Sequence, residues 1–113
     1  MRVHVGVGSN LGDRWGHLAH AARELRAAPR VALVAASRVW DAAPLGPPQP
    51  RYLNAVLELE TDLPPLDLLG VLQEVERTGG RKRGPVRWAA RTLDLDLLLY
   101  GDLPNSHELE TFT

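Results

Sequence analysis

With 113 residues, the chain is long enough for one domain and too short for two, and its hydrophobic content of 44% is ordinary for a globular protein. Its 13 Lys and Arg residues nearly balance 14 Asp and Glu residues, which excludes a generally basic nucleic-acid binder and a protein held at a membrane surface by charge. Because cysteine is absent, disulfides, thiolate metal sites and a cysteine nucleophile are excluded too.

The N-terminal residues predict a strand followed by a helix. Valines alternate with histidine and glycine over residues 2–8, which indicates a strand buried on its valine side and is unlike the apolar run of a signal peptide. We therefore expect a cytoplasmic protein without a membrane span. Apolar residues then recur at three- and four-residue spacing from Leu11 to Leu25, which predicts an amphipathic helix with Asp13 as candidate N-cap and Pro29 as its stop.

Two strands are predicted next. Residues 31–40 are β-branched and apolar enough for a long second strand, which ends at a proline-rich loop over residues 44–50. Residues 52–61 alternate strictly, which predicts a third strand with leucine and alanine on one side. Tyr52 and Asn54 lie on the other side of this strand.

The last predicted elements are a helix and a strand. Pro64 and Pro65 suit a helix entry, and a leucine stripe continues from there to the glycines at 79 and 80. Residues 93–100 predict a fourth strand near the middle of the sheet. One face of this strand carries Leu93, Leu95, Leu97 and Leu99, and the other carries Asp94, Asp96, Leu98 and Tyr100.

The element order βαββαβ is that of the ferredoxin-like α+β fold, a four-stranded antiparallel sheet with two helices on one face. We expect a single domain over 1–113, with its core in 1–101 and a short tail over 102–113. The helices cover the valine and leucine faces. The uncovered face then combines missing side chains, one aromatic ring and several polar groups, which suits a ligand: Gly6, Gly8, Tyr52, Asn54, Asp94 and Asp96.

Asp94 and Asp96 are candidate metal ligands. Side chains alternate along a strand, so both point the same way, and their Cα atoms lie about 7 Å apart at a rise of roughly 3.3 Å per residue. Carboxylates at this spacing repel each other unless a cation lies between them. Hard oxygen ligands without cysteine or paired histidine favour Mg²⁺, which completes its shell with phosphate and water. The alternative, which the short pattern alone would favour, is a solvated pair of aspartates.

An arginine-rich segment over residues 77–91 precedes the two aspartates and contains no acidic residue. Arginine binds phosphate oxygens in bidentate fashion while a cation neutralises the remaining charge, so this arrangement suits a metal-bound polyphosphate. The alternatives are a solvated basic loop and a contact with nucleic acid. The two adjoining signals together favour the binding of a magnesium nucleotide.

Five other residues are weaker candidates. Tyr52 and Asn54 could stack on a planar ring and pair with its donors and acceptors, or merely end a strand and cap a loop. Gln73 and Glu76 lie three residues apart on the second helix, where exposure to solvent is the default expectation. Trp88 lies among the arginines, where an exposed tryptophan usually packs on something, so it could close over the nucleotide.

Four motifs of the chain occur together in one known family. They are Gly8-Ser9-Asn10-Leu11-Gly12, Pro44-Leu45-Gly46, Tyr52-Leu53-Asn54-Ala55 and, most specifically, Arg87-Trp88 followed by Arg91-Thr92-Leu93-Asp94-Leu95-Asp96-Leu97-Leu98. In these motifs the chain closely resembles the hydroxymethyl-dihydropterin pyrophosphokinases (HPPK) of the folate pathway, from the first strand to about Gly101. The resemblance implies transfer of the terminal diphosphate of ATP to 6-hydroxymethyl-7,8-dihydropterin, with release of AMP.

The resemblance also implies a role for each matching residue. Asp94 and Asp96 would bind two Mg²⁺ ions with ATP, while Arg81 and Arg91 would stabilise charge on the transferring group. Nucleotide contacts would be Gln73, Glu76, Arg83, Trp88, Arg91 and Leu98. Pterin contacts would be Pro44, Leu45, Tyr52 and Asn54. The partners would be ATP and the dihydropterin, with neither nucleic acid nor a membrane, for a monomer or a dimer.

The chain departs from the family pattern in places. Ala42-Ala43 stands where the family usually has Thr-Pro, and Ala89-Ala90 where it often has Gly-Pro. Family members are also expected to continue for tens of residues past this point, so a shortened, non-catalytic homologue that binds pterin or nucleotide is the alternative function. An RNA-binding module of the same topology is disfavoured, because the first strand lacks aromatics and the two aspartates would repel phosphate.

Overall fold

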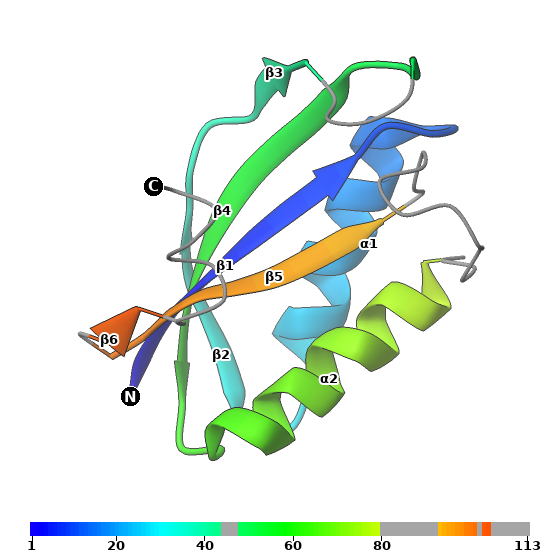
Figure 1. Cartoon of the computed structure of the whole chain (residues 1–113). Helices are drawn as coiled ribbons and strands as arrows, with labels where there is room; N and C mark the ends of the chain where they lie inside the picture. Colours follow the sequence, from blue (N-terminus) through cyan, green and yellow to red (C-terminus); the bar gives the residue numbers. More distant parts are fainter. Residues whose placement is uncertain (44–47, 80–92, 102, 105–113) are drawn as a thin grey trace.

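The computed structural model describes residues 1–43, 48–79, 93–101 and 103–104. Two helices cover one face of an antiparallel sheet (Figure 1). The helices are α1 (Arg14–Ala27) and α2 (Pro65–Thr78). The strands are β1 (Arg2–Ser9), β2 (Val31–Ala36), β3 (Trp40–Ala42), β4 (Tyr52–Thr61), β5 (Asp94–Tyr100) and β6 (Leu103–Pro104). Apart from the short β3 and β6, this is the predicted ferredoxin-like βαββαβ order.

The sheet has the order β2-β4-β1-β5-β6, with β3 also beside β4. β1 and β4 are paired along their whole lengths, from Arg2 opposite Glu60 to Ser9 opposite Leu53. The predicted position of the last long strand near the middle is therefore wrong, since among the described strands only the two-residue β6 lies outside β5. In each βαβ unit the second strand lies beyond the first strand of the other unit, so β1 and β4 lie in the centre of the sheet.

The predicted long strand over 31–40 is divided into β2 and β3, which pair with successive parts of β4. Between them, the Ser37 N–H donates to the Val56 carbonyl at 2.8 Å, and the Val56 N–H donates to Ser37 Oγ at 2.7 Å. The hydroxyl takes the place of a backbone acceptor, so the Val56 N–H keeps a partner between the two strands.

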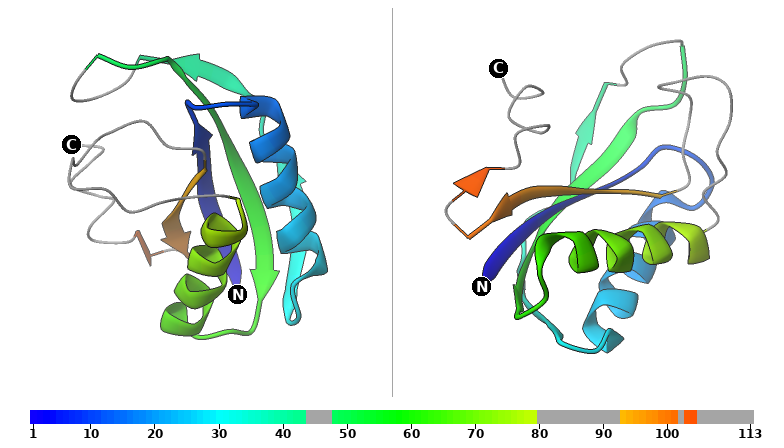
Figure 2. Two further views of the ribbon diagram at one scale, coloured as in Figure 1. Left: turned by 90° about the vertical axis from the view of Figure 1, so that its right-hand side faces the viewer. Right: turned by 60° about the horizontal axis from the view of Figure 1, so that its bottom comes forward.

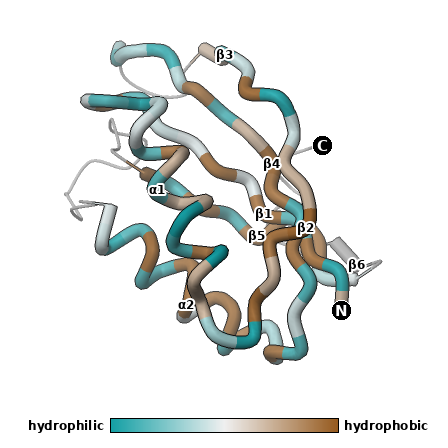
Figure 3. Tube along the Cα trace, turned by 180° about the vertical axis from the view of Figure 1, so that it is seen from behind, coloured by the Kyte–Doolittle hydropathy of each residue, from teal (hydrophilic) through white to brown (hydrophobic). Residues whose placement is uncertain are grey.

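The core lies between the sheet and the helices, as the alternation predicts. Figure 2 shows in its right-hand view both helices below the sheet, and in Figure 3 hydrophobic and hydrophilic residues alternate along β4. The buried residues of the helices are mostly apolar: Leu18, Ala21 and Leu25 from α1, and Leu68, Leu72, Val75 and Glu76 from α2. Asp13 caps α1 as predicted, because its Oδ1 accepts the Gly16 N–H at 3.0 Å. Neither of these two helices, nor any other helix in the described residues, is long and apolar enough to cross a membrane.

The prediction of which face of the sheet each side chain occupies is wrong at the end of β5. Val5 pairs with Leu97 but His4 pairs with Leu99, so Leu98 is an extra residue on β5. Such a bulge reverses the alternation that follows it. Tyr100 consequently lies opposite Val3 and packs against the core instead of standing on the uncovered face. Its hydroxyl donates to the Leu63 carbonyl at 2.5 Å.

Candidate functional site

The candidate site lies on the uncovered face, at the end of the sheet where β1 ends and β4 and β5 begin (Figure 1). Gly8 of β1 pairs with Asn54 on one side and with Asp94 on the other. Neighbouring strands lie about 4.8 Å apart, so the Cα atoms of Asn54 and Asp94 are roughly 10 Å apart. Directly opposed residues share a face, so the amide and the carboxylate stand on either side of a residue without a side chain.

Gly8 leaves space that neighbouring side chains of β4 use. A Cβ atom at this position would lie 2.9 Å from Asn54 Oδ1 and 3.3 Å from Tyr52 Cδ1. Both side chains therefore reach over the backbone of β1, and both residues are half-buried. The prediction that Tyr52 and Asn54 share the uncovered face is confirmed.

A second row of residues lies one step further along the sheet. Gly6 pairs with Val56 on one side and with Asp96 on the other. A Cβ atom at Gly6 would lie 3.4 Å from Leu98 Cδ1, which places the Leu98 side chain on the same face. Asp94 is half-buried and Asp96 is exposed. The two carboxylates thus share the uncovered face as predicted, with Cα atoms about 7 Å apart.

This pair of carboxylates fits a Mg²⁺ site. Within the residues that the structure describes, no three His, Cys, Asp or Glu side chains are grouped as metal ligands. The two aspartates would supply hard oxygen ligands, and phosphate and water would suit the other positions, which is the arrangement that Mg²⁺ favours. Gly6 and Gly8 place no side chain next to either carboxylate from the β1 side.

Glu76 was expected to be exposed to solvent on α2, and this expectation is wrong. Its exposed fraction is 6%, and its Oε2 accepts the Leu95 N–H at 2.8 Å. The residue lies four positions after Leu72, on the side of α2 that is buried, and it finds a backbone donor at the outer edge of β5. Gln73 is exposed, as expected.

The remaining predicted site residues lie outside the described residues, and their roles stay predictions. They are Pro44, Leu45, Arg81, Arg83, Trp88 and Arg91.

The structure adds Trp40 to the residues around the site. Trp40 pairs with Asn54, so its side chain extends the row of Asn54, Gly8 and Asp94 on the same face. Its exposed fraction of 47% is high for a tryptophan. A bulky aromatic residue at the end of the predicted second strand was the only signal for it in the sequence.

Asn10 is the second residue that the structure adds, and it holds the segment before Tyr52 in place. It follows β1, is fully buried, and donates from Nδ2 to Gln49 Oε1 at 2.6 Å and to the Pro50 carbonyl at 3.1 Å. These bonds fasten the segment before Tyr52 to the end of β1. Sequence reasoning could not find them, because the partners lie 39 and 40 residues away.

Comparison with known proteins gives a consistent family assignment. The family model described as 7,8-dihydro-6-hydroxymethylpterin-pyrophosphokinase (HPPK) matches residues 4–111. The chain is 46% identical over 102 residues to the 2-amino-4-hydroxy-6-hydroxymethyldihydropteridine pyrophosphokinase of Pseudomonas aeruginosa, which covers 89% of this chain and 62% of that protein. It is 45% identical over 102 residues to the protein of the same name from Pseudomonas putida, covering 90% of this chain and 84% of that one.

A more distant relative of the same name, from Bacillus subtilis, is 37% identical over 110 residues, covering 96% of this chain and 63% of that protein. The chain thus spans less than two thirds of the length of the Pseudomonas aeruginosa and Bacillus subtilis proteins. The family match nevertheless covers nearly all of this chain, including both aspartates and the residues around Gly8. The chain therefore belongs to the 7,8-dihydro-6-hydroxymethylpterin-pyrophosphokinase family.

Proposed function

We propose that the protein is a pyrophosphokinase that transfers the terminal diphosphate of ATP to 6-hydroxymethyl-7,8-dihydropterin in the presence of Mg²⁺. The observation that carries the proposal is the row of Asn54, Gly8 and Asp94 across three strands. An amide and an aromatic ring stand on one side of a bare stretch of backbone, and the carboxylate pair stands on the other. A planar ring held by the amide and the aromatic ring would present its substituent to the carboxylate pair.

Tyr52 and Asn54 would hold the pterin. A tyrosine ring can stack on a flat heterocycle, and an amide can both donate to and accept from the polar atoms of its edge. The glycine at position 8 lets the ring approach the backbone closely. Pro44 and Leu45 would complete this part of the site.

Asp94 and Asp96 would hold and orient the metal-bound phosphates. When bound, Mg²⁺ supplies positive charge that offsets the charge of the phosphates and favours deprotonation of a neighbouring hydroxyl group. Arg81 and Arg91 would stabilise negative charge on the transferring group through bidentate hydrogen bonds. Further nucleotide contacts would come from Gln73, Arg83, Trp88 and Leu98.

The reaction needs little covalent participation from the protein. The pterin hydroxyl oxygen forms a bond to the β-phosphorus of ATP, the bond from that phosphorus to the α–β bridging oxygen breaks, and AMP leaves while the hydroxyl proton passes to solvent. Positioning of the two substrates and stabilisation of charge are therefore the main contributions expected from the side chains.

An assay of AMP release tests this proposal. With the dihydropterin and Mg-ATP, we expect AMP and the pterin diphosphate in equal amounts, and no product in EDTA. Asp94→Asn and Asp96→Asn should each lower the rate about 100-fold or more, because each removes a charged metal ligand. Asp67→Asn, an exposed position on α2, is the matched control and should leave the rate unchanged. Binding of the pterin without turnover would favour the non-catalytic alternative, and absence of binding would contradict both.

A further inference from the structure

Glu76 carries the one charged side chain that is buried among the residues that the structure describes. It belongs to the last turn of α2, and its exposed fraction is 6%. Burial of a carboxylate is unfavourable unless hydrogen bonds satisfy it. The Leu95 N–H donates to Oε2 at 2.8 Å, and a hydrogen bond to a charged acceptor is stronger than one between neutral groups.

This bond reaches the outer edge of β5 between the two candidate metal ligands. Leu95 lies opposite Val7 on β1, but its N–H points to α2. β6 covers β5 only at Leu99 and Tyr100. The backbone N–H and C=O groups of successive strand residues point to alternate edges of the strand. Those of Asp94 and Asp96 therefore point toward β1. β5 is thus held by β1 at Asp94 and Asp96, and by Glu76 at Leu95 between them.

A second contact fastens the same turn of α2 to the residue before Asp94. A Cβ atom at Gly79 would lie 2.5 Å from Leu93 Cδ2 and 3.1 Å from Leu93 Cβ, so the helix end packs directly on Leu93. Leu93 is fully buried. The end of α2 therefore holds the backbone on both sides of Asp94.

We propose that Glu76 is a positioning residue for the metal-binding pair. The inference rests on the proposed function, since it assigns Asp94 and Asp96 to the metal. By fixing β5 at Leu95, the buried carboxylate sets the separation and direction at which the two aspartates meet the cation. Removal of groups that orient metal ligands typically lowers metal affinity about 10- to 100-fold.

Two substitutions of Glu76 separate the hydrogen bond from the charge. Glu76→Leu removes the acceptor, whereas Glu76→Gln keeps an acceptor oxygen on a side chain of the same length. The measurements are Mn²⁺ affinity by calorimetry, with an ATP analogue that carries a methylene group between the α and β phosphates, and hydrogen exchange of the Leu95 amide by NMR. We expect Glu76→Leu to lower Mn²⁺ affinity about tenfold or more and to speed exchange at Leu95 about tenfold or more. Glu76→Gln should stay within about threefold of the unaltered chain in both measurements.

Thr61→Val is the control for a general loss of stability. Thr61 is 3% exposed and hydrogen-bonded at the opposite end of β4, so its replacement should destabilise the fold while Mn²⁺ affinity stays unchanged. The inference is overturned if Glu76→Leu binds Mn²⁺ normally, if Thr61→Val loses as much affinity, or if Glu76→Gln is as impaired as Glu76→Leu.

Two further outcomes separate the inference from the proposed function. A loss of nucleotide affinity in Glu76→Leu that is the same with Mn²⁺ and with EDTA would make Glu76 a direct nucleotide contact and overturn the inference alone. Failure of the unaltered chain to bind Mn²⁺ with the analogue would overturn the proposed function and the inference together.

Discussion

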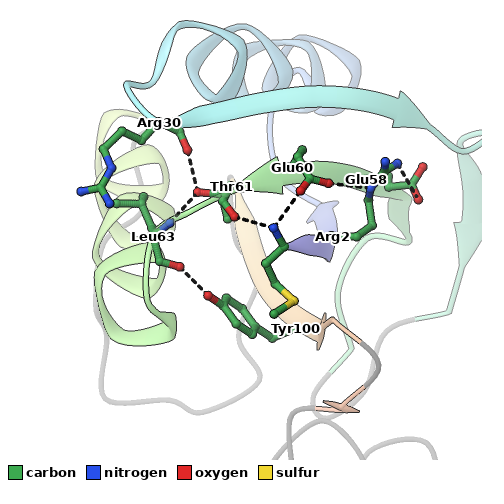
Figure 4. Close-up of polar contacts among 8 residues, drawn as sticks. Arg2, Arg30, Glu58, Glu60, Thr61, Leu63 and Tyr100 are labelled. Atoms are coloured by element: carbon green, nitrogen blue, oxygen red, sulfur yellow. Dashed lines mark hydrogen bonds and ion pairs between the residues drawn. The ribbon is translucent and has the colours of Figure 1, made fainter.

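The two ends of the sheet are built in different ways. At the end that carries the N-terminus, polar groups bond closely to one another (Figure 4). The N-terminal ammonium donates to Glu60 at 2.7 Å and to the Thr61 carbonyl at 2.9 Å. Thr61 Oγ1 donates to the Arg30 carbonyl at 2.6 Å and accepts the Leu63 N–H at 3.1 Å. At the other end, polar side chains are arranged around the bare backbone of Gly8 on the uncovered face.

The difference separates stability from binding geometry. The bonds around Thr61 join segments that are distant in sequence and satisfy buried backbone groups, so their loss should reduce the free energy of unfolding. Around Gly8, the same kind of bond serves to place side chains: Asn10 fastens the segment before Tyr52, and Glu76 fastens β5. Substitutions at the two ends should therefore affect different measurements.

Gly8→Ala is expected to have the largest effect on binding of the three substitutions that test this comparison. Gly8 lies within β1, where alanine is allowed, but its Cβ atom would lie 2.9 Å from Asn54 Oδ1. The amide must then move, so we expect pterin affinity to fall about tenfold or more, or about 1.4 kcal/mol. The free energy of unfolding should change by less than about 1 kcal/mol, because only the ends of flexible side chains are displaced and alanine restricts the unfolded chain. Fluorescence titration with the pterin and urea denaturation give the two quantities.

Gly70→Ala is the matched control for this substitution. It lies on an exposed part of α2, and a Cβ atom there would meet nothing within 4 Å. Alanine should raise stability by up to about 1 kcal/mol and leave pterin affinity unchanged. Unchanged pterin affinity in Gly8→Ala would remove Asn54 from the proposed pterin site.

The uncovered face could be predicted from the sequence because it depends on alternation within single strands. Tyr52 and Asn54 on β4, and Asp94 and Asp96 on β5, follow a period of two that needs no knowledge of strand order. Tyr100 could not be placed this way. The bulge before it depends on how β5 pairs with β1, more than ninety residues earlier in the chain.

The burial of Glu76 was missed for a related reason. A helical period places it on the same side as Leu72 and Val75, but a glutamate is normally assigned to solvent. What allows its burial is the Leu95 N–H at an edge of β5 that no strand covers in the described residues. Strand order decides which backbone donors lack a strand partner, and the sequence alone does not give that order.

Thr61→Val tests the end of the sheet that carries the N-terminus, and its effect should be confined to the stability of the fold. Valine has the shape of threonine but neither donates to Arg30 nor accepts from Leu63. We expect the free energy of unfolding in urea to fall by about 1–3 kcal/mol, while pterin and Mn²⁺ affinities stay unchanged. Thr78→Val removes a hydroxyl that bonds to the Val75 carbonyl and to His20 at an exposed position of α2, so it should cost less, about 1 kcal/mol or less. A loss of pterin affinity in Thr61→Val would show that the two ends are coupled and would contradict the comparison.

Glu60→Gln should have the smallest effect, which depends on pH. The N-terminal ammonium, and after it Arg2, hydrogen-bond to this carboxylate and hold its pKa below the ordinary value of 4.5. A carboxyl group with a lowered pKa in the folded state stabilises the fold above its ordinary pKa and loses that contribution as the pH falls through the lowered value. Glu60→Gln should therefore unfold at a lower temperature than the unaltered chain at pH 7, and the two should converge as the pH falls through the lowered pKa of Glu60. Because the pair is exposed, added NaCl should shrink the difference at pH 7. A difference that persists in acid, once the Glu60 carboxyl group is protonated, would show that Glu60 acts through packing and not through its charge.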